Sequence, residues 1–105
     1  MLEPRQEVFD AVVDPHRRRI LQLLTEGELP VQGLVDQFDL SFSAISQHLK
    51  VLRGAGLVAR RRAGKNQLYS LKPEPLKDLH EWTEIYRRAW LGRLARLRTL
   101  VEEEM

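Results

Sequence analysis

Apolar residues in the first half of the chain recur at the three- and four-residue steps of a helix, and they predict four helices. Each helix would turn one group of apolar side chains inward: Val8, Phe9, Val12 and Val13; Ile20, Leu21, Leu23 and Leu24; Leu34, Val35 and Phe38; Ile45, Leu49 and Leu52. Groups of this kind are typical of amphipathic helices that bury one face.

Capping residues set the limits of these helices. Asp14 followed by Pro15 predicts the start of the second helix, because aspartate caps free backbone N–H groups and proline has none to leave unpaired. A third helix of about ten residues would begin near Pro30. The fourth would run from an N-cap at Ser41 to Gly54.

The pattern changes after the fourth helix. Residues 57–62 and 67–71 are strand-like runs joined by a predicted hairpin turn, and a long final helix then extends to about Glu103. The predicted fold is mainly α with a small β-hairpin. Its order is four helices, two strands and a last helix, in a winged helix-turn-helix arrangement, with residues 1–105 as a single domain.

The third and fourth helices, with a tight turn between them, predict a helix-turn-helix unit. On the fourth helix, Ile45, Leu49 and Leu52 form one narrow stripe at about 100° per residue. The rest of the surface offers side chains suited to base edges and phosphates: Ser43, Ala44, Ser46, Gln47 and Lys50. This helix carries no Asp or Glu. Its outer face therefore predicts binding to double-stranded DNA.

The hairpin has a basic tip and basic flanks. Its candidate DNA-binding residues are Arg60, Arg61, Arg62, Lys65 and Asn66. Successive residues of a strand point to opposite faces, so three consecutive arginines cannot all meet one DNA surface. We expect two of the arginines, together with Lys65, to contact the DNA backbone or the minor groove.

Charge and composition narrow the class of protein. Residues 40–73 contain seven Lys and Arg and no Asp or Glu, which leaves −5 for the rest of a chain whose net charge is +2. A basic middle framed by acidic ends is typical of a surface that binds nucleic acid. The chain has no cysteine, no stretch apolar enough to cross a bilayer and charged residues where a signal peptide would be apolar, which predicts a cytoplasmic protein.

The final helix carries one continuous apolar stripe with steps of three and four residues: Leu79, Trp82, Tyr86, Trp90, Leu94, Leu97 and Val101. A helix of this length is longer than the predicted winged-helix body, so much of the stripe would stay exposed to water in a monomer. Phe9 and Val13 of the first helix would join it. We therefore predict a homodimer with residues 1–13 and 76–103 at its interface, which would present two recognition helices to a palindromic site.

Several segments resemble the ArsR family of winged-helix repressors. Residues 46–58 read SQHLKVLRGAGLV, like the recognition helix of that family. The wing segments RRAGK at 61–65 and LYSL at 68–71, and the helix DPHRRRILQLL at 14–24, extend the resemblance over nearly the whole chain. The resemblance implies a dimeric repressor that binds an operator, often that of its own operon, and that is released by a sensed ligand.

The sequence departs from the metal-sensing members of that family. The segment that aligns with their cysteine motif, residues 28–34, reads ELPVQGL and has no thiolate. Asp78 and His80 match half of a second family site, but the later histidine is missing. We therefore predict no metal and no cofactor, although an unusual site that includes Asp78 and His80 stays open. The inducer would be a non-metal or protein-level signal, if there is one.

Enzymatic activity is not expected, because the three histidines lie on different predicted elements and no nucleophilic grouping or Gly-rich phosphate loop occurs. His48 falls beside the apolar stripe and is predicted at the edge of the core. The arginines at 17–19 predict a solvated helix face, with support of DNA-backbone binding as the alternative. The alternative function is a winged-helix module that binds protein or RNA, although the acid-free Ser/Gln/Lys face favours duplex DNA.

Overall fold

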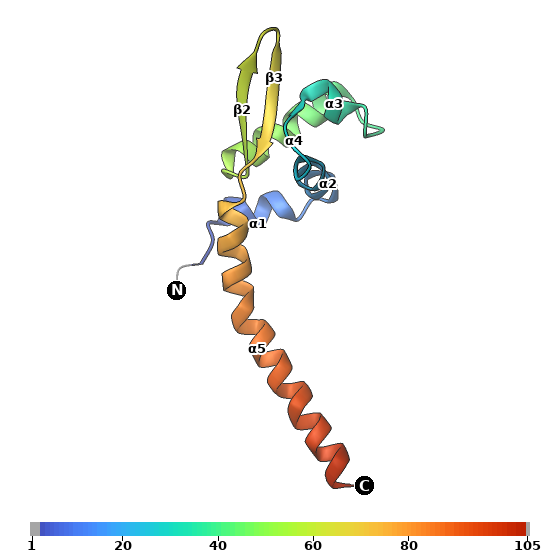
Figure 1. The fold of residues 1–105 in the computed structure, drawn as a ribbon, viewed down its shortest axis with the longest axis vertical. Helices are drawn as coiled ribbons and strands as arrows, with labels where there is room; N and C mark the ends of the chain where they lie inside the picture. Colours follow the sequence, from blue (N-terminus) through green and yellow to red (C-terminus); the bar gives the residue numbers. More distant parts are fainter. Residues whose placement is uncertain (1–2, 105) are drawn as a thin grey trace.

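The computed structural model describes residues 3–104 and shows a small helical body from which one long helix extends (Figure 1). The elements follow in the order α1 (Gln6–Val12), α2 (Pro15–Leu24), β1 (Leu29–Pro30), α3 (Val31–Val35), α4 (Phe42–Gly54), β2 (Val58–Ala63), β3 (Asn66–Leu71) and α5 (Glu74–Glu103). The three strands form one antiparallel sheet in the order β1-β3-β2. The predicted mainly α fold with its hairpin is confirmed.

The helix starts follow the predicted caps. The Asp14 carboxylate accepts hydrogen bonds from the backbone N–H groups of His16 at 2.8 Å and Arg17 at 3.2 Å, and Pro15 occupies the first helical position. Burial on its own would raise the pKa of Asp14, but these two backbone donors outweigh it and lower the pKa. At α4, the Ser41 hydroxyl accepts from the backbone N–H of Ala44 at 3.1 Å. The start of each helix is therefore set by a cap from a neighbouring residue in the sequence.

The core lies where α2, α3, α4 and the sheet meet. Its most deeply buried side chains are Ile20, Leu34, Ile45, Leu49, Leu52 and Leu57. The predicted inward faces of the second, third and fourth helices are thus confirmed at these positions. The first helix differs, because Val8 is buried whereas Val13, which follows α1, is 69% exposed.

The region around Pro30 differs from the prediction. Instead of a helix of about ten residues, Leu29–Pro30 forms the short edge strand β1, and α3 contains only Val31–Val35. Leu29 pairs with Tyr69 and Pro30 with Leu68 across β3. Proline is acceptable here because β1 lies at the edge of the sheet.

Two arginines join α1 to α2. Arg17 donates to the carbonyls of Ala11 and Asp10, both at 2.8 Å, and Arg18 donates to the carbonyls of Val12 and Val13 at 2.8 and 3.0 Å. These carbonyls lie at the C-terminal end of α1, where a helix leaves them without partners and carries partial negative charge. Arg18 stays exposed, as a solvated face predicts, but both arginines also have a structural role that the sequence did not indicate, since they hold the C-terminal end of α1.

Helix α5 contains 30 residues, which corresponds to a length of about 45 Å, and runs far past the body (Figure 1). None of its residues is buried. Its first turns lie beside α1, where the rings of Phe9 and Trp82 meet edge to face with centroids 5.1 Å apart. Within residues 3–104, no helix is long and apolar enough to cross a membrane.

Candidate nucleic-acid interface

Helix α4 presents the predicted recognition residues on the side away from the core. Ser43, Gln47 and Lys50 are exposed, and Ala44 and Ser46 are half-buried beside them. The opposite side of the helix is fully buried through Ile45, Leu49 and Leu52. The packing of α4 therefore fixes which of its side chains point outward. Its first turn contains no acidic residue, so the partial positive charge of its N-terminus is not neutralised there.

The wing separates its three arginines as strand alternation predicted. Arg60 lies opposite Tyr69 and Arg62 opposite Gln67 across β2 and β3, whereas Arg61 lies opposite Leu68 and so belongs to the other face. Arg60 and Arg62 therefore share one face of the sheet.

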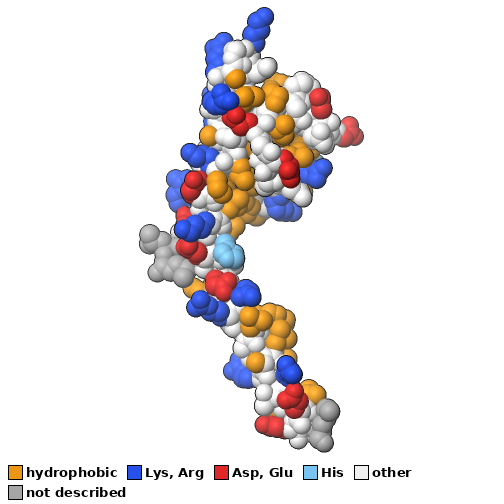
Figure 2. Space-filling view, in the orientation of Figure 1, with side chains coloured by type: hydrophobic (Ala, Val, Ile, Leu, Met, Phe, Trp, Pro, Cys, Tyr) orange, Lys and Arg blue, Asp and Glu red, His pale blue; other side chains and the backbone are white. Residues whose placement is uncertain are grey.

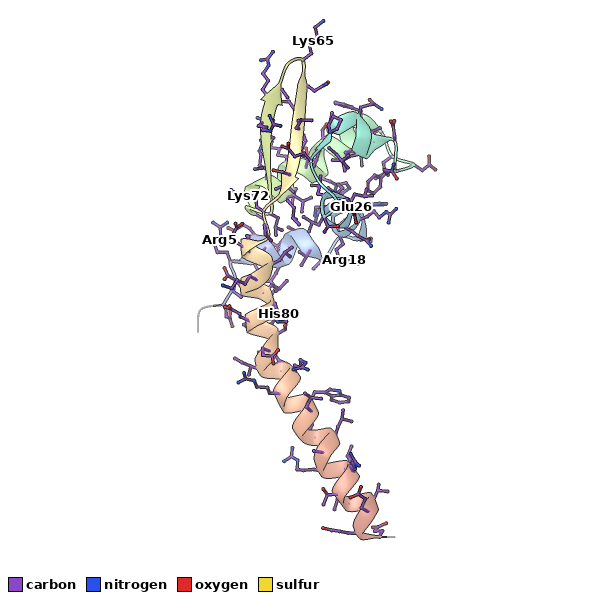
Figure 3. The ribbon with its side chains drawn as sticks, viewed as in Figure 1. Arg5, Arg18, Glu26, Lys65, Lys72 and His80 are labelled. Carbon is purple, nitrogen blue, oxygen red and sulfur yellow. The ribbon has the colours of Figure 1, made fainter. Side chains whose placement is uncertain are left out.

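The turn between the strands consists of Gly64 and Lys65, since Ala63 pairs with Asn66. Gly64 has φ 63°, while no residue other than glycine has a positive φ within residues 3–104. Glycine at the first turn position with a normal second residue matches a type II′ hairpin turn. This turn places Lys65 at the tip of the wing (Figure 3). Figure 2 shows Lys and Arg side chains at this tip and along the outer edge of the wing.

Arg61 forms a two-pronged ion pair with Glu28, with Nε–Oε2 and Nη2–Oε1 distances of 2.8 Å. The hydrogen bonds from Arg61 lower the pKa of Glu28, and those to Glu28 raise the pKa of Arg61. The sequence predicted that two of the three arginines contact DNA but did not single out Arg61, because Glu28 lies 33 residues away along the chain and meets Arg61 only in the folded protein. The pair competes with any contact between Arg61 and phosphate.

His48 lies at the edge of the core, as predicted. It is half-buried, with its Nδ1 3.4 Å from Nη1 of Arg17 and its ring centroid 5.8 Å from that of His16. His16 also meets Phe38 edge to face at 6.1 Å. The contacts of His48 with Arg17 and His16 tie α4 to α2, so His48 positions the helix and does not join its outer face.

The predicted dimer residues form an uncovered apolar surface on α5. Trp82 is half-buried against Phe9, and from residue 85 onward the large apolar side chains are 43% to 60% exposed. They are Ile85, Tyr86, Trp90, Leu91, Leu94, Leu97, Leu100 and Val101, of which the stripe prediction did not include Ile85, Leu91 and Leu100. Val13 of the α1–α2 junction is also exposed.

Asp78 and His80 are both exposed on the first turns of α5, where Figure 3 labels His80. Across residues 3–104, no group of three or more His, Asp or Glu side chains is placed to hold a metal ion. Within one chain, Asp78 and His80 therefore do not belong to a group of three or more candidate ligands.

The helix pair α3–α4, followed by the two-stranded wing, defines a winged helix-turn-helix transcriptional regulator. The profile of the family described as "Bacterial regulatory protein, arsR family" matches residues 14–60. Over 75 residues the chain is 37% identical to "Transcriptional repressor SdpR" of Bacillus subtilis, an alignment that covers 71% of this chain and 83% of that protein. The chain belongs to the ArsR family.

Further similar proteins support the same family. The chain is 36% identical over 96 residues to "HTH-type transcriptional regulator Rv2034" of Mycobacterium tuberculosis, covering 91% of this chain and 87% of that protein. A crystal structure titled "Possible transcriptional regulator for arsenical resistance" matches with a TM-score of 0.74 and 41% identity, over 87% of this chain and 95% of that one. These relatives are transcriptional regulators, which is a non-enzymatic role.

Proposed function

We propose that the protein is a homodimeric repressor that binds a palindromic operator through α4 and the wing of each subunit, and that the operator includes that of its own gene. The observation that carries this proposal is the outer face of α4. It is acid-free, exposes Ser43, Gln47 and Lys50, and is held rigidly by a buried apolar stripe on the other side. We also propose a cytoplasmic location, because a bacterial operator lies there.

Direct recognition would come from the N-terminal half of α4 in the major groove, which is wide enough for a helix. The amide of Gln47 can pair with the N6 and N7 atoms of adenine, and the hydroxyls of Ser43 and Ser46 can contact donors or acceptors on base edges. Ala44 is small enough to allow close approach, and Lys50 would bind a phosphate.

The wing would hold the DNA beside the groove. Arg60 and Arg62 share a face, Lys65 stands at the tip and Asn66 follows it. Cationic side chains here would neutralise phosphates or enter the minor groove. Arg61 would contribute only by leaving Glu28, so we propose Arg60, Arg62 and Lys65 as the main cationic contacts.

The dimer would cover the apolar surface of α5, with Phe9 and Val13 beside it. The charges of α5 favour an antiparallel pairing of two copies. Residues 85–101 contain five arginines and no acid, whereas residues 74–84 contain four acidic residues and one lysine. Glu102 and Glu103 add two acids at the C-terminal end of α5. Antiparallel helices would set the basic segment of one copy against the acidic segment of the other, and parallel helices would set like charges together.

A gel-shift assay tests the proposed function. The purified dimer should bind a duplex from the promoter of its own gene more tightly than an unrelated duplex or an RNA of equal length. With about six to eight phosphates neutralised per dimer, the plot of log K against log salt should slope by roughly −5 to −7. A slope near zero would overturn DNA binding, and a preference for the RNA would favour the alternative module.

Base recognition by α4 can be tested separately with Gln47→Ala. Loss of the amide should weaken operator binding by about 1–3 kcal/mol per half-site and leave binding to the unrelated duplex nearly unchanged. Gln22→Ala, at an exposed glutamine of α2 outside the proposed interface, is the matched control. Equal operator discrimination in the Gln47 variant and the wild type would show that the recognition face is wrongly assigned.

A further inference from the structure

Phe42, the first residue of α4, is unusual in its surroundings. It is 54% exposed. Between Val13 and Ile85, every other large apolar side chain is buried or half-buried. Val13 and the side chains from Ile85 onward belong to the proposed dimer surface. Phe42 is therefore the one large apolar group of the body that neither the core nor that surface uses.

The place of Phe42 at the N-terminal end of α4 distinguishes it from other exposed apolar residues. Single exposed apolar residues are common on proteins and need no explanation by themselves. Phe42, however, directly follows the N-cap Ser41 and precedes the exposed Ser43 at the leading end of α4. Recognition helices contact base edges with their N-terminal residues. A side chain at this end would reach the DNA even though its row on the helix continues toward the buried Ile45.

The apolar character of the Phe42 ring limits which groups of DNA it could contact favourably. A phenyl group neither donates nor accepts a normal hydrogen bond, so it gains nothing from phosphates or from the polar edges of bases. In the major groove, the apolar group on a base edge is the 5-methyl of thymine. Contact with this methyl would remove both apolar surfaces from water.

We propose that Phe42 contacts the 5-methyl group of a thymine in each operator half-site and so selects thymine at that position. The inference rests on the proposed DNA-binding function and adds to it a specificity-determining residue. The ring would distinguish thymine from uracil, which differs only by the methyl, while Ser43 and Gln47 contact neighbouring bases through hydrogen bonds. The contact would be made once per subunit.

The expected size of the effect follows from the burial of one methyl group. Removing it should weaken binding about fourfold per half-site, and about 15-fold when both half-sites are changed. The experiment is a scan of the footprinted operator in which each symmetry-related pair of thymines is replaced by deoxyuridine. Binding is measured for the wild type, Phe42→Ala and Phe42→Leu, with Gln22→Ala, at an exposed position outside the proposed interface, as the control.

One symmetric pair of substitutions should weaken wild-type binding about 15-fold. The same pair should not further weaken Phe42→Ala, but it should still weaken Phe42→Leu and Gln22→Ala. Thermal melting and affinity for an unrelated duplex should be unchanged in Phe42→Ala, which would exclude a merely structural role.

Wild-type binding that is insensitive to every deoxyuridine pair would overturn the proposal, as would a Phe42→Ala protein that keeps the wild-type sensitivity. If the wild type still binds the operator in preference to the unrelated duplex in either case, the proposed function survives. If the wild type shows no such preference, the proposed function fails and the assignment of Phe42 fails with it.

Discussion

The winged-helix body and α5 use similar apolar residues in opposite ways. In the body, leucines and isoleucines from α2, α3 and α4 are almost fully removed from water by residues of the same chain. In α5, leucines, tyrosine and tryptophan at helical spacing stay exposed, and no residue of the helix is buried. The comparison teaches that helical periodicity reveals an apolar face but does not identify what covers it.

The outer face of α4 and the apolar stripe of α5 also differ in whether they tolerate a charged side chain. On the outer face of α4 a cation meets solvent now and would meet phosphate in a complex, so the fold tolerates it. On the stripe of α5 a charge is tolerated only in a monomer. Substitutions in the two regions should therefore separate folding, dimerisation and DNA binding.

The largest effect is expected for Leu97→Glu in the α5 stripe. In a dimer the carboxylate would be buried against an apolar surface twice, once per subunit, at a cost of several kcal/mol per dimer. The variant should sediment as a folded monomer and lose operator binding although α4 is intact, because two linked recognition helices bind far better than one.

Ala95→Glu, on the opposite side of the same exposed helix, is the control and should remain a dimer. A folded Leu97→Glu monomer that binds the full operator with wild-type affinity would show that dimerisation and DNA binding are not linked.

Leu49→Ala tests the body. This side chain is 1% exposed, so its truncation should leave a cavity and lower the free energy of unfolding by about 2–5 kcal/mol. Urea denaturation at several protein concentrations measures the loss. Leu100→Ala, which truncates an exposed leucine of α5, should change chiefly the concentration dependence of the transition. Equal losses for the two variants at all concentrations would contradict the difference between the regions.

A smaller effect is expected on the salt dependence of DNA binding. Lys65→Ala should weaken all DNA sequences alike and make the log K–log salt slope less steep by about one to two units, since both subunits lose a phosphate contact. Arg61→Ala should change the slope less, because Arg61 already pairs with Glu28. Lys77→Ala on α5 is the control. A larger change for Arg61 than for Lys65 would mean that the ion pair opens on DNA.

The smallest effect concerns the pH dependence of the Glu28–Arg61 pair. The pKa of Glu28 is held below its ordinary value of 4.5, so the pair adds stability above that pH and loses it as the pH falls through the lowered pKa. Both side chains are exposed, so the contribution is small. Wild type should exceed Glu28→Gln slightly in urea midpoint at pH 7, and the two should converge once the pH falls below the lowered pKa of Glu28. A constant difference would contradict this assignment.

The sequence predicted what periodicity and caps encode. The buried stripe of α4, the Asp14 and Ser41 caps and the hairpin were all evident from local spacing. The strand β1 was not, since two residues are too few to show alternation, and it exists only through pairing with Tyr69 and Leu68 of β3. The third helix starts beside Pro30 as predicted but ends at Val35, because residues 36–38 continue as turns whose N–H groups bond to the carbonyls of Gln32, Leu34 and Val35.

The candidate site was predictable to a similar degree. Which residues of α4 face outward followed from its buried stripe. The role of Arg17, which binds the end of α1, and the pairing of Arg61 with Glu28 depend on contacts between distant segments. The importance of Phe42 required knowledge of exposure, because its spacing to Ile45 and Leu49 alone would place it in the core.

The placement of the two tryptophans on α5 gives the protein a built-in optical probe. Both tryptophans of the chain lie on this helix. Trp82 is already half-buried beside Phe9 and Tyr86, with centroids 5.1 Å from each ring, whereas Trp90 is 60% exposed. Trp90 has the larger exposed area to lose on association, so most of any change in tryptophan emission on dilution should come from Trp90. Neither α4 nor the wing contains an indole, so this fluorescence would follow subunit association without direct interference from bound DNA.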